Sequence, residues 1–328
     1  MKVIIPAAGF ASRLKPHTYL VPKAMLPIAN KPIIGHIMEQ VIAWGGTNAV
    51  IVVGHLHEKI ELYVRNNFGI PVEFRMQEPQ VGLGHAVMTG LDADDEEVLI
   101  ILGDTILDLD ITEAIARGVT SIGVKRVDDP RKMGVVVTEG RRVTQLVEKP
   151  PDPPSDLAIV GIYYIRNGGL LKRAISEIIA DGITVKGEYQ ITDALQRMVE
   201  WGERIETFTV DKWYDCGLPG TVLTTNRYLL DKSGNQISKS STVFNSIIIP
   251  PVSISGEVLI ENSIIGPYLS IADGSSVRFS QISNSIIGGK AVIERSLLKD
   301  SLIGDRVEIR GSYQVLNIGS SSQMGLNG

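Results

Sequence analysis

Cysteine and histidine are scarce in this chain of 328 residues, and its 37 acidic residues outnumber its 32 lysines and arginines. Cys216 is the single cysteine, which excludes an internal disulfide and a cysteine-based zinc cluster and is typical of the reducing cytoplasm. The net charge is −5 and no long basic run occurs, so we expect neither a nucleic-acid partner nor binding to an anionic membrane. Long apolar runs are also missing, because the opening MKVIIPAAG is too short for a signal peptide or a membrane span. These absences predict a cytoplasmic protein.

The first 232 residues alternate strand and helix patterns. Short apolar runs rich in β-branched residues are typical of strands that a parallel sheet buries on both faces. The pattern predicts strands at 2–5, 49–54, 72–77, 96–104, 134–139, 142–149 and 158–165, and helices at 30–46, 57–69 and 190–202. This repetition indicates an α/β fold with a doubly wound, mostly parallel, Rossmann-like sheet. In the helix at 30–46 we expect Asn30 as N-cap, Pro32 in the first turn, and one apolar face. That face comprises Ile33, Ile34, Ile37, Met38, Val41 and Ile42.

The pattern changes after residue 232. Residues 233–243 are polar and break both periods, so we interpret them as a linker. From 244 to 328, groups centred on Ile, Val or Leu recur about every five to six residues, as in NSIIGPYLSI and NSIIGGKAVI. Strands that turn a corner at each repeat predict a short left-handed β-helix, the alternative being an ordinary small β-domain. The closing GSSSQMGLNG is low in complexity and is expected to be disordered.

The stretch PAAGFASRLKPHTYLVPKAMLPI, residues 6–28, leaves the first predicted strand through a turn of small residues. Such turns let backbone N–H groups approach phosphate oxygens closely. The stretch lacks both G-x-G-x-x-G and G-K-[ST], which excludes the dinucleotide fingerprint and the P-loop. It keeps two cations, Arg13 and Lys23, that could meet a polyphosphate. On their spacing alone, two loop cations are more often solvated surface residues than functional ones.

Residues 6–34 as a whole resemble the signature of the sugar-1-phosphate nucleotidylyltransferases. Further motifs follow in that family's order: QEPQVGLGHAV, ILGD, VDDPRKMGVV, LVEKPPDPPSDLAIVGIYYI, GEYQITDAL and WYDCGLPGTV. The resemblance covers most of residues 1–230. With the β-helix behind it, the chain is most similar to the long form of the glucose-1-phosphate thymidylyltransferases. Ala8 and Gly9 replace the family's paired glycines, and PAAG is closer to the bacterial uridylyltransferases, so the choice between dTTP and UTP stays open.

The resemblance implies transfer of a nucleotidyl group from dTTP or UTP to glucose-1-phosphate, with Mg²⁺ as cofactor and pyrophosphate as product. It implies that Arg13 and Lys23 bind the nucleotide phosphates and that Asp104 and Asp215 hold the metal and complete the catalytic set. The implied nucleotide contacts are Ala8, Gly9, Arg13, Lys23, Gln77, Gly82 and Asp104. The implied sugar-phosphate contacts are Gly134, Glu148, Lys149, Val160 and Asp215.

Each of these residues also has a structural interpretation. Asp104 could cap a turn after its strand, Glu148 and Lys149 could form a salt bridge, and Gln77 and Gly82 could be ordinary loop residues. Cys216 is expected to be a small buried residue rather than an activated thiol. His55 and His57 resemble a metal pair but lack a clear third ligand.

Two other functions fit the same two-domain plan. Many proteins with a hexapeptide β-helix are acyltransferases that use a histidine on the helix, but the five histidines here all lie at or before position 85. A regulatory or assembly subunit without catalysis is the other alternative, and the presence of Arg13, Lys23, Asp104, Lys149 and Asp215 favours an enzyme. Because solenoid edges need covering, we expect a homo-oligomer.

Overall fold

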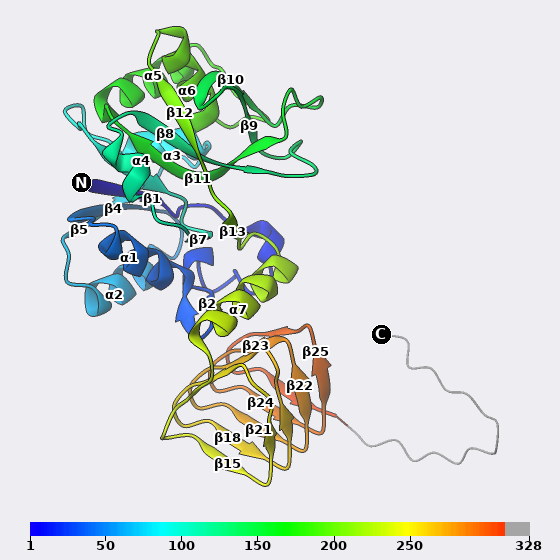
Figure 1. Ribbon diagram of the computed structural model, residues 1–328. Coiled ribbons are helices and arrows are strands. Elements are labelled where there is room, and N and C mark those ends of the chain that lie inside the picture. Colours follow the sequence, from blue (N-terminus) through cyan, green and yellow to red (C-terminus); the bar gives the residue numbers. More distant parts are fainter. Residues whose placement is uncertain (312–328) are drawn as a thin grey trace. The chain divides into compact units, whose positions relative to one another are not determined.

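A nine-stranded sheet is the centre of the first unit, residues 1–225, in the part of the chain that the structure describes (Figure 1). The structure is a computed structural model that describes residues 1–311, so the tail expected to be disordered lies outside the described residues. The strand order is β5-β4-β1-β6-β11-β8-β12-β10-β9. These strands are β1 (Lys2–Pro6), β4 (Asn48–Val53), β5 (Val72–Met76), β6 (Val98–Ile101), β8 (Thr120–Arg126), β9 (Gly134–Glu139), β10 (Arg142–Glu148), β11 (Leu157–Ile165) and β12 (Ile205–Thr209).

Fewer than half of the strand pairs in this sheet are parallel, so the expectation of a mostly parallel sheet is wrong. The pairs β5–β4, β4–β1, β1–β6 and β8–β12 are parallel, whereas β6–β11, β11–β8, β11–β9, β12–β10 and β10–β9 are antiparallel. The cause is local for β9 and β10, because Gly140 and Arg141 alone connect them. A two-residue loop can only join antiparallel strands, and Gly140 has the positive φ of 62° that such loops favour.

Helices lie on both sides of the parallel strands, as the doubly wound pattern predicts (Figure 1). One apolar cluster joins Ile4 of β1 and Val52 of β4 to Val87, Ile175 and Leu195 from three helices. Since side chains alternate along a strand, Ile5 and Ile51 face the other side, and both are fully buried. The helices are α1 (Ile33–Ala43), α2 (His57–Asn67), α3 (Leu83–Gly90), α4 (Thr112–Ala116), α5 (Gly168–Ala180), α6 (Ile191–Glu200) and α7 (Pro219–Ser233).

The start of α1 differs from the expected capping. Asn30 is not the N-cap, because it forms with Ala29 the turn between β2 (Pro27–Ile28) and β3 (Lys31–Pro32). Both turn residues have positive φ, 48° and 60°, which asparagine tolerates better than most residues. Pro32 takes the N-cap position instead. The predicted apolar face is buried except at Ile42, which is 41% exposed.

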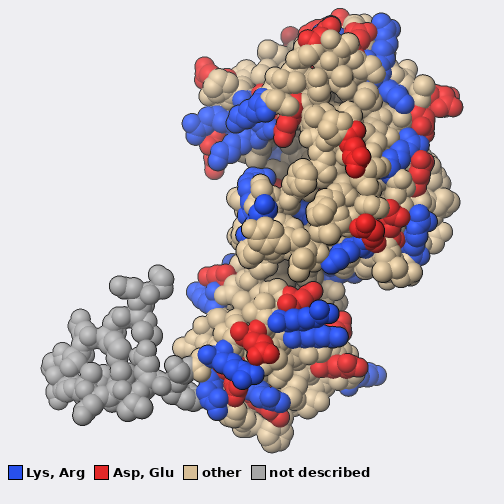
Figure 2. Space-filling view, turned by 180° about the vertical axis from the view of Figure 1, so that it is seen from behind, with Lys and Arg blue, Asp and Glu red and all other residues tan. Residues whose placement is uncertain are grey.

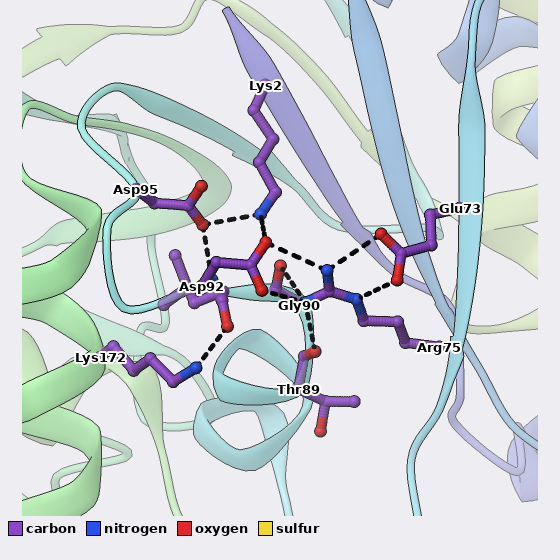
Figure 3. A network of polar contacts seen from close by, with 9 residues as sticks. Lys2, Glu73, Arg75, Thr89, Gly90, Asp92, Asp95 and Lys172 are labelled. Atoms are coloured by element: carbon purple, nitrogen blue, oxygen red, sulfur yellow. Dashed lines mark hydrogen bonds and ion pairs between the residues drawn. The ribbon is translucent and has the colours of Figure 1, made fainter.

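A network of charged side chains lies beside the amino end of β1 (Figure 3). The Asp92 carboxylate accepts from both terminal nitrogens of Arg75 at 3.0 Å and from Lys2 Nζ at 2.7 Å. Arg75 also binds Glu73, and Lys2 also binds Asp95. The network therefore ties β1 and β5 to the segment that follows α3.

The second unit, from Asn226 onward, is built from three parallel sheets of very short strands. Partner residues lie 17 positions apart in the first coils, as in Ser253↔Ser270, and 16 apart later, as in Ile286↔Leu302. The strands are β14 (Gln236–Ile237), β15 (Thr242–Phe244), β16 (Ile247–Ile248), β17 (Val252–Ile254), β18 (Leu259–Glu261), β19 (Ile264–Ile265), β20 (Leu269–Ile271), β21 (Ser276–Arg278), β22 (Gln281–Ser283), β23 (Ser285–Ile287), β24 (Val292–Glu294), β25 (Leu297–Lys299), β26 (Leu302–Ile303) and β27 (Glu308–Arg310).

Stacked side chains hold these coils in register. Ile260, Val277 and Ile293 occupy equivalent positions in successive coils and are fully buried. A serine ladder runs beside them, in which the N–H of Ser263 donates to Ser246 Oγ and the N–H of Ser280 donates to Ser263 Oγ. This stacking is what a β-solenoid requires, and its left-handed sense stays a prediction. Residues 233–243, expected as a linker, contain β14 and the start of β15.

Candidate active site

The segment between β1 and α1 carries both predicted phosphate-binding cations. It leaves the sheet at Pro6, and its next residue, Ala7, donates its N–H to Val52 O at 2.7 Å. Two short 3-10 turns follow, and they hold Arg13 (Ser12–Leu14) and Lys23 (Lys23–Met25). Parallel strands place ligand sites at their carboxyl ends, and this segment lies at that end of β1.

Asp104 meets Lys23 at this edge. It follows β6, the parallel neighbour of β1, and the N–H of Gly103 donates to Pro6 O at 2.9 Å. A Cβ on Gly103 would lie 2.8 Å from that same oxygen, so the close approach requires glycine. Lys23 Nζ lies 2.5 Å from Asp104 Oδ2, and the lysine side chain is only 13% exposed. The pair is a well-defined ion pair rather than a solvated surface contact.

Asp215 reaches the same cation from another part of the chain. It ends β13 (Lys212–Asp215), which pairs antiparallel with β7 (Thr105–Asp108), so Asp215 stands opposite Thr105. Lys23 Nζ lies 3.9 Å from Asp215 Oδ1. Burial and the neighbouring Asp104 carboxylate raise the pKa of Asp215, while Lys23 and Arg13 act in the opposite direction. Two carboxylates and two cations therefore form one cluster.

Arg13 belongs to this cluster although its side chain is exposed. A Cβ built on Gly217 would lie 2.8 Å from Asp215 Oδ2 and 3.2 Å from Arg13 Nη2. The guanidinium and the carboxylate thus approach the same point beside Gly217, and a larger residue there would push them apart. The formal charges of the cluster sum to zero, since Arg13 and Lys23 are balanced by Asp104 and Asp215. A polyanion would therefore bind here only together with a further cation.

The donor set at Asp104 and Asp215 fits Mg²⁺. Two carboxylates that share one lysine repel each other, as the raised pKa of Asp215 indicates, and a divalent cation would relieve that repulsion. Mg²⁺ prefers oxygen ligands and is commonly held by one or two carboxylates together with substrate phosphates. Within residues 1–311, no group of three or more His, Cys, Asp or Glu side chains is placed to hold a metal alone. Phosphate oxygens would have to complete the coordination.

The predicted base-contact residues lie at the carboxyl end of β5. Gln77 follows that strand, is 4% exposed, and donates from Nε2 to Gly82 O at 2.9 Å. Gly82 has φ of 116°, and a Cβ there would lie 2.4 Å from Tyr189 O, so only glycine fits. Gln77 lines a cavity of about 540 Å³. The other lining residues are Phe10, Gly54, His55, Leu56, His57, Glu58, Met76, Glu78 and Gln80.

The predicted sugar-contact residues form a second polar cluster. Glu148 ends β10 and stands opposite Gly134 of β9 in the antiparallel pair. Its carboxylate is 8% exposed and lies 3.2 Å from Lys149 Nζ, so the salt bridge that the sequence left open is formed. Thr192 Oγ1 donates to Glu148 Oε2 at 2.6 Å, and a Cβ on Gly134 would lie 2.8 Å from that hydroxyl. Any side chain at position 134 would therefore clash with this tightly packed cluster.

Strand β11 connects the sugar-contact cluster to Asp104. Val160 is buried at 1% exposure in this strand, and Gly161 next to it has φ of 84°. The register with β8 shifts between Ile159 and Tyr163, and the N–H of Leu102 donates to Gly161 O at 3.0 Å. Leu102 is two residues before Asp104. The predicted residues therefore share one edge of the sheet, while Ala8 lies buried and Gly9 exposed in the loop after β1.

Two residues of this site were not singled out from the sequence, Thr192 and Asp193 at the start of α6. Thr192 orients Glu148, and Asp193 has a buried Oδ2 atom that accepts no hydrogen bond within residues 1–311. Burial first, and the Glu148 carboxylate second, raise the pKa of Asp193 to about 6, while Lys149 acts in the opposite direction. The motif GEYQITDAL contained both residues, but the sequence could not show that they face Glu148.

Cys216 is a structural residue, as expected. It is fully buried, and burial raises the pKa of its thiol to about 12. His57 Nδ1 lies 2.9 Å from Glu61 Oε1, one turn further along α2. No metal-binding group that includes His55 or His57 occurs in the described part of the chain.

Surface charge in the first unit is mixed. On the face in Figure 2, Lys and Arg side chains gather beside a recess in this unit, and acidic side chains lie next to them and elsewhere on the same face. No helix in residues 1–311 is long and apolar enough to cross a membrane.

Comparison with known proteins agrees with this geometry. A sequence profile of the nucleotidyl transferase family matches residues 2–232. The low-salt glycan biosynthesis nucleotidyltransferase Agl11 of Haloferax volcanii is 30% identical, over 100% of this chain and 99% of that protein. A glucose-1-phosphate thymidylyltransferase of Streptomyces griseus is 29% identical, over 96% of this chain and 95% of that protein.

Solved structures extend the comparison to the fold. The structure of a UDP-glucose pyrophosphorylase in complex with UDP-glucose aligns with a TM-score of 0.63 and 28% identity. The alignment covers 70% of this chain and 98% of that one. The α/β fold of the first unit is therefore that of enzymes that handle nucleotide sugars.

Proposed function

The chain belongs to the nucleotidyl transferase family, and from that premise we propose that it makes dTDP-glucose from dTTP and glucose-1-phosphate, releasing pyrophosphate. Membership carries the broader activity of a sugar-1-phosphate nucleotidyltransferase. UTP in place of dTTP, giving UDP-glucose, is the alternative. One relative is a thymidylyltransferase, and one similar structure is a UDP-glucose pyrophosphorylase.

The observation that carries the proposal is the position of Lys23 between two carboxylates. Its ammonium lies 2.5 Å from Asp104 and 3.9 Å from Asp215, and Arg13 Nη2 and Asp215 Oδ2 both lie close to Gly217. Nucleotidyl transfer brings two polyanions together, so the site must supply positive charge rather than a strong base. A regulatory subunit without catalysis would have no need of this arrangement.

The chemistry requires no general base. An oxygen of the sugar phosphate attacks the α-phosphorus of the triphosphate, and the bond to the bridging oxygen breaks as pyrophosphate leaves with the electron pair. A phosphate monoester has a second pKa of about 6, so the attacking oxygen is already anionic at neutral pH. We assign Lys23 to the charge that develops at the α-phosphate and Arg13 to the β- and γ-phosphates of the leaving group.

Asp104 and Asp215 are the residues that would hold Mg²⁺. When bound, the ion supplies positive charge that both substrates' phosphates can share. Before any metal binds, Lys23 keeps the two carboxylates together in the arrangement described. With a metal ion held by Asp104 and Asp215, the Lys23 ammonium would be available to bind the phosphates.

The remaining contacts divide between base and sugar. We assign Gln77 and Gly82 to the pyrimidine edge, with Ala8 and Gly9 beside the nucleotide. Lys149 is assigned to the sugar phosphate. Gly134, Glu148 and Val160 are assigned to the sugar ring, because a buried carboxylate between Thr192 and Lys149 is suited to accept hydrogen bonds from hydroxyl groups.

Pyrophosphate release tests the proposal directly. Purified enzyme is incubated with Mg²⁺ and glucose-1-phosphate and is offered dTTP, UTP, CTP, ATP and GTP separately. We expect turnover with dTTP or UTP, loss of turnover with EDTA and its return with Mg²⁺. Asp104→Ala should abolish turnover, whereas Asp152→Ala, an exposed carboxylate to which no role is assigned, should not. Silence with all five nucleotides, repeated with other sugar-1-phosphates, would leave only the regulatory subunit.

For the second unit we propose an assembly role as a left-handed β-helix in a homo-oligomer. The stacked parallel sheets support a β-helix, and the absence of histidine after position 85 argues against the acyltransferase alternative. Light scattering on the full chain tests the assembly role. A monomer at micromolar concentration would contradict it.

A further inference from the structure

Gln77 makes two hydrogen bonds that together fix the orientation of its side-chain amide. Its Nε2 donates to Gly82 O at 2.9 Å, and the same nitrogen lies 3.3 Å from Nδ1 of His85 on α3. A carbonyl oxygen can only accept, so the atom that faces Gly82 must be the nitrogen. Both N–H groups of the amide are then in use. Gln77 Oε1 accepts no hydrogen bond within residues 1–311 and is left for a ligand.

An amide oxygen without a partner in the protein would determine which bases the cavity can accept. Gln77 lines the cavity of about 540 Å³, whereas His85, which contacts the Gln77 amide nitrogen, does not line it. Uracil and thymine carry an N–H at N3, which an amide oxygen can accept. Cytosine presents a lone pair at N3, which would face the lone pairs of that oxygen. A fixed Oε1 therefore favours the first two bases and disfavours the third.

His85 must accept at Nδ1 to play this part. The Gln77 amide nitrogen has N–H groups to donate and no lone pair to accept with, so Nδ1 is the acceptor of this contact. Without His85, one N–H of Gln77 would lose its partner, and a single hydrogen bond, to Gly82 O, would restrain the amide. With one restraint instead of two, the position of the amide oxygen would be less well fixed.

We propose that His85 is a positioning residue for nucleobase selection, holding Gln77 so that its oxygen meets a pyrimidine N3–H. The proposal rests on the proposed function, since it assumes that the cavity beside Gln77 takes the base. It goes beyond that function by naming a residue that selects the base without contacting it.

Two substitutions at this position separate the role of the acceptor from that of the ring. His85→Asn keeps an acceptor oxygen near the position of Nδ1, whereas His85→Leu keeps the bulk and removes the acceptor. We expect His85→Leu to lower the ratio of kcat/KM for UTP or dTTP over CTP roughly tenfold, mainly through KM for the nucleotide. His85→Asn should keep that ratio within about threefold. KM for glucose-1-phosphate should stay unchanged in both variants.

A double-mutant cycle with Gln77→Leu asks whether the two residues act together. If His85 works through Gln77, adding His85→Leu to Gln77→Leu should change the base preference no further. Equal loss of preference in His85→Leu and His85→Asn, or no loss in either, would overturn the proposal. Thermal unfolding of each variant shows whether the fold is retained.

Binding measured without turnover keeps this test separate from the proposed function. Calorimetry with UTP, dTTP and CTP, in the absence of sugar phosphate, reads base preference even if no product forms. A wild-type preference for UTP or dTTP that His85→Leu reduces and His85→Asn retains supports the proposal. Equal binding of all three nucleotides by the wild-type chain would refute it, whatever the activity assay shows.

Discussion

The backbone N–H of Cys216 donates to the carbonyl oxygen of Asp104 at 3.0 Å. This bond joins the end of β13 to the start of β7 and places the Asp215 and Asp104 carboxylates beside each other. Cys216 contributes through its backbone and its small buried side chain, not through thiol chemistry. The metal-binding pair that we propose is thus built on a strand ladder, which restrains both carboxylates before any ligand arrives.

Lys23→Ala tests the cation of this cluster. We expect kcat to fall by about 10²- to 10³-fold, because removing one preorganised charge at a reacting centre has effects of that size. The two carboxylates would also lose the ammonium that neutralises them and competes with a metal ion for them, so the apparent affinity for Mg²⁺ should rise rather than fall. Steady-state kinetics over a range of Mg²⁺ concentrations measures both effects. Lys239→Ala, an exposed lysine of the second unit, is the matched control, and equal losses in the two variants would contradict the assignment.

Gly82→Ala tests the packing of the base-contact loop. The added Cβ would lie 2.4 Å from Tyr189 O and 2.7 Å from Tyr189 N at a φ of 116°, and neither backbone atom can move alone. We expect a loss of about 2 kcal/mol in the free energy of unfolding and a higher KM for the nucleotide. Urea unfolding and kinetics report the two effects. Gly69→Ala, where the added Cβ meets nothing within 4 Å, should change neither.

Asp92→Asn tests the network of Figure 3, away from the catalytic edge. Hydrogen bonds from Arg75 first, and from Lys2, hold the pKa of Asp92 below its usual value. A lowered carboxyl pKa stabilises the folded protein above the unfolded value of about 4, and the gain is lost as the pH falls further. We expect Asp92→Asn to lower the free energy of unfolding by about 1 kcal/mol at pH 7, since the site is partly exposed.

Urea unfolding of this variant at pH 7 and near pH 3 is the measurement. The difference from wild type should shrink at the lower pH, and kcat should stay unchanged. Asp152→Asn removes the same charge at an exposed position that has no ion-pair partner among residues 1–311, and it serves as the control. A difference that does not depend on pH would contradict the electrostatic explanation.

Asp193→Asn should have the opposite sign. Because its pKa is raised to about 6, the folded wild-type protein loses stability as the pH rises from about 4 to about 6 and does not regain it above. A shift from 3.8 corresponds to roughly 3 kcal/mol at most, and solvent screening of a partly exposed carboxyl reduces this to about 1. The variant should therefore gain about 1 kcal/mol at pH 8 and nothing at pH 4. A loss of stability at pH 8 would refute this account of Asp193.

The sequence predicted the strands better than their pairing. Apolar runs identified β1, β4 and β6 because strand patterns are local. The resemblance singled out Arg13, Lys23 and Asp104, and the structure brings these residues close together, whereas their roles stay predictions. The antiparallel half of the sheet escaped prediction, since strand direction depends on which distant strand is the neighbour. Thr192 and Asp193 escaped for the same reason: they face Glu148, which lies more than 40 residues earlier in the chain.

The coil length of 16 or 17 residues limits how the second unit can change in length. Every strand there pairs with the equivalent strand one coil away, so losing a single residue inside a strand would turn all later side chains to the wrong face. Removing or duplicating a whole coil would leave each remaining side chain in its own column. The length of this unit can therefore change by whole coils, and the buried side chains of the remaining coils would keep their positions.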